Sequence, residues 1–210
     1  MYTHLRAHPR LLCLASVVAL IPLWAPPASS TPVVGFDFDG AGGVFELSPD
    51  TLAPGLAAAP WSDLDGVFSS VAGNPGLALS SRSFHDGNSL LFALSVLPGY
   101  VLALDGFAFD QRASASGPSN WALSIAGAQV ANGTTSTSFA GRSGMLGLSG
   151  LAGDVVIALS GTGASSSAGT WRVDNFSLTG AVSPVPLPPS LLLLLSSVLG
   201  LVGMRFCSAT

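Results

Sequence analysis

Apolar residues in the middle of this chain recur at every second position, and this alternation constrains the fold more than any other feature of the sequence. Successive side chains of an extended strand point to opposite faces, so a period of two predicts strands with one buried face. The pattern runs through Leu90, Phe92, Leu94 and Val96, through Trp121, Leu123 and Ile125, and through Val155, Ile157 and Leu159.

Turn-forming residues separate these segments, for example at Asp86-Gly87-Asn88, Pro98-Gly99 and Asn132-Gly133. We therefore expect about eight to ten strands in an all-β fold, an antiparallel β-sandwich of the jelly-roll type. The alanine-rich stretch 51–59 is the one segment in which we expect a short turn of helix.

Two strands change phase. Apolar positions move from even to odd numbers across Asp105-Gly106, and again across Asp174-Asn175. One extra residue at each point restores the inward face, so each strand is predicted to carry a β-bulge.

The sandwich is predicted to span residues 31–183, which is long enough for one domain with a real core. This part holds four arginines against eleven acids, a net charge of −7, and the chain has no lysine. Such a balance argues against a nucleic-acid partner. Both cysteines, Cys13 and Cys207, lie outside it, so disulfides are not expected to hold it together.

The N-terminal segment has the layout of a signal peptide. Arg6 and Arg10 precede an apolar run, Leu11 to Trp24, and small residues follow up to Ser30. We expect signal peptidase to cut after Ser30, which makes residues 1–30 the signal peptide. A retained N-terminal anchor is the alternative.

The C-terminal segment combines a proline-rich hinge, residues 184–190, with an apolar helix and short tail, residues 191–210. From Pro189 to Phe206 a helix would be roughly 27 Å long, close to the thickness of a bilayer core. One basic residue, Arg205, follows the apolar run. We expect this helix to hold the chain in the inner membrane, at least during export. The hinge itself reads Val185, Pro186, Leu187, Pro188, Pro189 and Ser190.

The hinge, the helix, Arg205 and the signal peptide together resemble the PEP-CTERM (VPLPA-type) sorting proteins of Gram-negative bacteria. The family often has alanine where this chain has Pro189, and a basic cluster where it has Arg205 alone. The resemblance implies recognition and cleavage of the motif by an exosortase. It also implies a final location at the cell surface or in an extracellular polysaccharide or biofilm matrix.

Carboxylates near the two ends of the domain suggest a structural calcium ion. Asp37 and Asp39 flank the inward Phe38, and Asp174 lies in the last strand. First and last strands of a jelly roll are often neighbours, so the three acids could meet around a cation that prefers oxygen ligands. The alternative is that these aspartates are solvated or cap turns.

Catalytic patterns are weak in this sequence. His85 is the one histidine of residues 31–183, no Gly-x-Ser-x-Gly motif occurs, and nothing in the spacing of the acids selects a catalytic pair. Among the aromatic residues, Trp61 stands in an apparent loop and is the candidate platform for stacking a sugar ring.

Three hypotheses follow. The first is a non-enzymatic surface or matrix protein, the second a carbohydrate-binding module delivered by the same route, and the third a hydrolase of unrecognised type. A eukaryotic lipid-anchor signal is the alternative reading of the tail. In that case Asn132 and Asn175 would be glycosylation acceptors.

Overall fold

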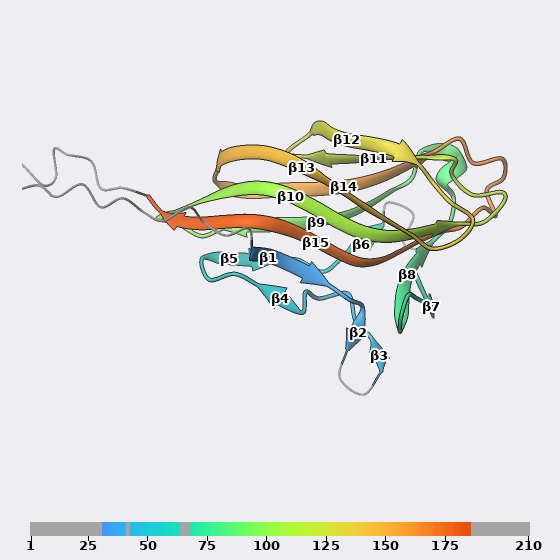
Figure 1. Cartoon of the computed structure of the whole chain (residues 1–210), viewed down its shortest axis with the longest axis horizontal. Coiled ribbons are helices and arrows are strands. Elements are labelled where there is room, and N and C mark those ends of the chain that lie inside the picture. The colour runs from blue at the N-terminus through green and yellow to red at the C-terminus, as the bar shows by residue number, and fades with distance from the viewer. Residues whose placement is uncertain (1–30, 41–42, 64–67, 186–210) are drawn as a thin grey trace, which may run out of the picture.

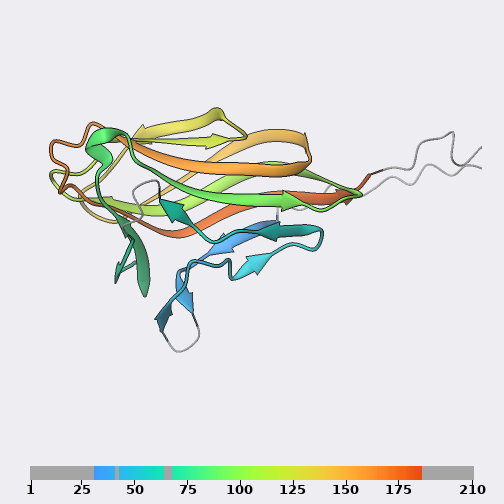
Figure 2. The ribbon, with the colours of Figure 1, turned by 180° about the vertical axis from the view of Figure 1, so that it is seen from behind.

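The computed structural model describes residues 31–40, 43–63 and 68–185, which form two antiparallel sheets packed face to face (Figures 1 and 2). Ten of its fifteen strands have four or more residues, and the other five have two or three. Every strand pairing among the described residues is antiparallel. The predicted jelly-roll-like β-sandwich is confirmed.

The first sheet has seven strands and follows the order β13-β10-β15-β1-β4, with β8 paired to β15 and β7 paired to β8. The predicted neighbourhood of the first and last strands is confirmed by the pairing of β1 with β15. The bounds are β1 Thr31–Phe36, β4 Thr51–Leu52, β7 Ser69–Ala72, β8 Leu77–Ser81, β10 Tyr100–Ala113, β13 Ala140–Leu151 and β15 Trp171–Pro184.

The second sheet has six strands in the order β12-β11-β14-β9-β5, with β6 also paired to β9. Its bounds are β5 Leu56–Ala58, β6 Ser62–Asp63, β9 Ser89–Val96, β11 Asn120–Ile125, β12 Ala128–Thr134 and β14 Gly153–Thr162. A small hairpin, β2 Asp39–Gly40 and β3 Val44–Phe45, and a 3-10 helix, η1 Phe84–Asp86, complete the described elements. The helical turn predicted for 51–59 is wrong, because this stretch forms β4 and β5.

The core lies between the sheets, and the alternation of the sequence decides its membership. In β9 every second residue from Leu90 to Val96 is buried, and β11 and β14 repeat the pattern. Both predicted bulges are present. The register of β10 shifts between Leu104 and Gly106, and β15 carries its extra residue at Asn175, whose φ is 48°.

Candidate functional site

The predicted sorting signals lie almost wholly outside the described residues. Of the residues in the predicted sorting motif, Val185 is described, and its backbone N–H donates to the carbonyl oxygen of Gly99 at 2.8 Å. Residues 186–190, Arg205 and the signal peptide are not described, so their sorting roles stay predictions. The described part of the chain contains no helix that is both long enough and apolar enough to cross a membrane.

Trp61 is not an exposed platform, and the prediction that placed it in a ligand site is wrong. Its side chain is 2% exposed and lies inside a cluster of aromatic rings. The cluster partners are contributed by β9, β15 and β1, with ring-centroid distances from Trp61 of 4.7 Å to Phe92, 5.1 Å to Phe176 and 5.5 Å to Phe36. The local sequence indicated a loop, but the loop turns its indole into the core.

Asp37, Asp39 and Asp174 do not assemble into the predicted metal site. The described residues contain no group of three or more His, Cys, Asp or Glu side chains that could hold a metal ion. Phe38, with a φ of 62°, breaks the extended strand between Asp37 and Asp39. Asp37 lies near Asp50, whose carboxylate accepts the Asp37 N–H at 2.7 Å. The Asp39 carboxylate accepts a different backbone group, the N–H of Leu77.

Asp39 and Asp174 instead hold the turn between β7 and β8. Asp39 accepts the Leu77 N–H at 2.7 Å, and Asp174 accepts the N–H groups of Asn74 and Asn175 at 2.6 and 2.8 Å. The hairpins β2–β3 and β7–β8 project from the same side of the sandwich (Figure 1). This geometry favours the turn-capping alternative over calcium coordination.

Burial makes the Asp174 carboxyl group harder to ionise. Desolvation raises its pKa to about 6, and the nearby Asp110 and Asp39 charges add to the effect, against the two amide hydrogen bonds, which lower it. The side chain is fully buried. The side-chain amide of Asn175 lies beside it and donates to the Asp110 carboxylate at 3.0 Å and to the carbonyl oxygen of Asn74 at 2.9 Å.

A hollow that the sequence analysis did not identify lies on the second sheet. It has a volume of about 440 Å³ and is lined by uncharged residues of β11, β12 and β14, namely Asn120, Trp121, Ala122, Gln129, Asn132, Gly133, Thr134 and Thr162. Alternation in β11 and β14 could have indicated that Asn120, Ala122 and Thr162 face outward. It could not indicate that the two strands are neighbours and that β12 flanks them.

Cross-strand register builds this hollow in two rows. Thr134, Asn120 and Thr162 lie side by side across β12, β11 and β14, and Asn132, Ala122 and Ser160 form the next row on the same face. Ala122 has the smallest side chain of its row, and the other two residues of the row, Asn132 and Ser160, are polar. We call this surface, Asn120, Ala122, Gln129, Asn132, Thr134 and Thr162, the amide face.

Trp121 supports the amide face from the inner side. Its ring is 5% exposed and meets Phe109 nearly perpendicularly, with centroids 5.1 Å apart. A Cβ atom on Gly133, its neighbour in register, would lie within 2.9–3.0 Å of the indole ring. Glycine at this position is therefore what lets β12 pass so close to the ring.

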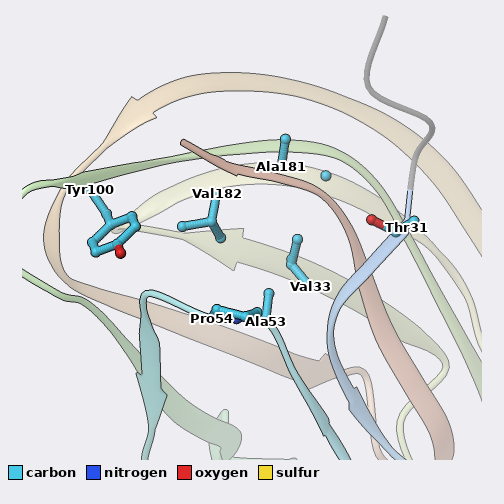
Figure 3. A pocket seen from close by; sticks show the side chains of 8 residues that line it. Thr31, Val33, Ala53, Pro54, Tyr100, Ala181 and Val182 are labelled. Carbon is cyan, nitrogen blue, oxygen red and sulfur yellow. The ribbon is translucent and has the colours of Figure 1, made fainter. Parts of the chain in front are cut away.

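A second pocket, of about 350 Å³, lies beside the start of β1 and the end of β15 (Figure 3). Tyr100, Val182, Val33 and Pro54 point toward it, and Thr31 lies at its far side. Tyr100 is 36% exposed, which makes it the most exposed aromatic side chain among the described residues. The lining is mostly apolar and offers few hydrogen-bonding groups.

Comparison with known proteins identified no matching family model and no matching curated protein. Similar solved structures include the CBM36-1 domain of a multidomain xylanase from the hindgut metagenome of Trinervitermes trinervoides, with 11% identity and a TM-score of 0.42 over 60% of this chain and 98% of that one. Another is a family 35 carbohydrate-binding module from an environmental isolate, with 18% identity and a TM-score of 0.42 over 65% and 95%. These likenesses concern the fold, and no ligand is inferred from them.

Proposed function

We propose that this chain is a non-enzymatic exported protein that binds polysaccharide through the amide face. The observation that carries the proposal is a hollow of about 440 Å³ lined with amide and hydroxyl side chains on an exposed sheet surface. Amides and hydroxyls both donate and accept hydrogen bonds, as sugar hydroxyls do. A volume of this size is typical of sites for small ligands or for short stretches of a polymer.

The chemistry of the hollow supports binding without turnover. General acid and base catalysis needs groups that exchange a proton near the working pH, and none of the residues that line the hollow carries such a group. Carboxylates also approach one another outside the hollow, but they bind backbone amides there: Asp39 and Asp174 hold the β7–β8 turn, and Asp50 accepts the Asp37 N–H. His85 lies on η1 and has an exposed side chain.

Affinity electrophoresis tests the binding proposal. The protein, expressed as residues 31–185 and as the full chain, is run through native gels that contain soluble polysaccharides. Retardation in at least one gel, without release of reducing ends from the same polymer, is the expected result. Free migration in every gel would overturn binding, and steady release of reducing ends by purified protein would overturn the non-enzymatic assignment.

For delivery, we propose passage through the inner membrane and C-terminal processing by an exosortase, followed by location at the cell surface or in the matrix. The support is the sequence resemblance carried by Val185 to Ser190 and Arg205. Mass spectrometry of the protein from its native cells should find a mature C-terminus near Val185 to Pro188. An intact Thr210 would refute processing, and glycans on Asn132 or Asn175 would support the lipid-anchor alternative.

A further inference from the structure

We infer that the amide face selects uncharged polysaccharide and seats it across β12, β11 and β14 above Ala122. This inference rests on the proposed function and deepens it by naming the ligand class and the position at which the ligand binds. Three features of the described residues carry it: the near absence of charge from the sheet, the unused hydrogen-bonding capacity of the hollow, and the small residue at its floor.

Charge is almost missing from the second sheet. Its six strands contain two ionisable acids, Asp63 and Asp154, and no basic residue. Asp63 accepts a hydrogen bond from Ser81 of the other sheet, and it pairs in register with the inward-facing Leu90. It therefore lies on the inner side of the sheet, away from the amide face.

Asp154 is remote from the hollow. It accepts the Ser95 hydroxyl at 2.6 Å and lies eight positions before Thr162 on β14. At about 3.3 Å per residue this separation is roughly 26 Å, about three Debye lengths at physiological salt. Its charge is therefore screened at the amide face.

Arg142 contacts the edge of this sheet from β13. The Arg142 guanidinium donates a hydrogen bond to the backbone oxygen of Thr134 at 3.1 Å. Arg142 pairs in register with the inward-facing Phe109, so it approaches β12 from the inner side. None of the side chains that line the hollow is positively charged, so a uronic acid on the amide face would meet amides and hydroxyls within a domain whose net charge is −7.

The polar side chains of the hollow are available to a ligand. Asn120 donates to Ser119 at 3.1 Å, whereas the side chains of Gln129, Asn132, Thr134 and Thr162 make no hydrogen bond to any described residue. All five are exposed, so they stay solvated until a ligand replaces the water. A carboxylate could only accept, and a guanidinium could only donate, but these groups can do both.

Ala122 sets the depth of the hollow. It stands in the middle of its row, between Asn132 and Ser160, and its side chain ends at Cβ. The longer side chains of Asn120, Gln129 and Thr162 lie around it. A ring placed over Ala122 can therefore approach the sheet closely while amides and hydroxyls reach its hydroxyl groups from both sides.

The test combines a ligand panel with a pair of matched variants. Native gels contain xylan, glucomannan or hydroxyethylcellulose as neutral polymers, and alginate or polygalacturonate as acidic polymers. The wild-type protein should be retarded by at least one neutral polymer and by neither acidic one. Retardation should survive 0.5 M NaCl and EDTA, because hydrogen bonds in this hollow need neither a counter-charge nor a metal.

Ala122→Leu should fill the hollow and raise the Kd for the neutral polymer by about tenfold or more. Ala158→Leu is the matched control, because Ala158 also faces outward on the second sheet but lies outside the hollow. The control should keep wild-type affinity. Gln129→Ala combined with Asn132→Ala should weaken binding as well, without adding bulk, so the test holds if Ala122→Leu fails to fold.

The outcomes separate the two proposals. Free migration in all gels would overturn the proposed function together with this inference. Salt-sensitive retardation by an acidic polymer would overturn the inference alone, because binding would then rest on charge. Neutral binding that Ala122→Leu and the double variant leave unchanged would also overturn it, by moving the site elsewhere on the domain.

Discussion

The Trp61 and Phe176 rings meet edge to face, with centroids 5.1 Å apart and planes at 85°. Trp61 belongs to the short connection between β5 and β6, and Phe176 belongs to the last strand, so one contact joins the two sheets. Phe36 and Phe92 complete the cluster around the indole. The residue that local sequence favoured for ligand binding is thus a central part of the core.

Trp61→Ala should therefore lower the free energy of unfolding and leave the affinity of the folded protein for polysaccharide unchanged. Truncating a buried tryptophan typically removes about 3–5 kcal/mol of the free energy of unfolding. Urea denaturation followed by fluorescence or circular dichroism measures this loss. Trp61→Phe, which keeps an aromatic ring in the cluster, should lose less. A folded Trp61→Ala protein of normal stability that no longer binds polysaccharide would contradict the assignment of Trp61 to the core.

Gly133→Ala should destabilise the edge of the second sheet. The added methyl group would lie 2.9–3.0 Å from ring atoms of Trp121, so β12 or the indole must shift. Overpacking of this kind usually costs about 1–3 kcal/mol. Gly35→Ala is the control, since a methyl group there would meet Thr51 at an ordinary 3.5 Å. Equal midpoints for the two variants in urea would show that β12 has room above Trp121.

Asp174 should make the domain less stable as the pH rises from about 4 to about 7. Its folded pKa of about 6 lies above the ordinary value of 3.8, so the native state binds more protons than the unfolded state between these values. The corresponding stabilisation is present at low pH and is lost as the pH rises through 6. The shift of about two units corresponds to an upper limit of roughly 3 kcal/mol.

Asp174→Asn isolates that contribution, because the asparagine does not titrate. The difference in unfolding free energy between wild type and variant should shrink or reverse toward pH 7, on top of a pH-independent loss from the changed hydrogen bonds to Asn74 and Asn175. Urea titrations at pH 4, 5, 6 and 7 measure it. A difference that stays constant across this range would rule out a raised pKa for Asp174.

Millimolar calcium should leave the thermal midpoint unchanged. The Asp39 and Asp174 carboxylates already accept backbone N–H groups of the β7–β8 turn and its neighbours, and Asp37 faces Asp50. Differential scanning calorimetry with calcium and with EDTA checks this expectation, with magnesium as a control for ionic strength. A rise in the midpoint that is specific to calcium and absent from Asp174→Asn would restore the predicted metal site.

Much of the fold could be predicted from the sequence, because burial of one strand face leaves a local trace. The alternation around Phe92, Leu123 and Ile157 identified buried positions, and the phase changes at Asp105 and Asp174 located both bulges. The metal prediction failed for a local reason that alternation cannot contain. Phe38 adopts a left-handed backbone conformation between the two acids. The Asp37 carboxylate accepts the Asp39 N–H, whereas the Asp39 carboxylate accepts the Leu77 N–H.

By itself, the sequence determined an all-β sandwich and the inward or outward direction of most strand positions, since these depend on side chains close together along the chain. Only the tertiary structure decided which outward positions become neighbours. Asn120 lies beside Thr134 and Thr162 because β11 pairs with β12 and β14 in one register. Trp61 is buried because rings from three other strands close around it. Both outcomes depend on contacts between distant segments, which form only when the sheets are assembled.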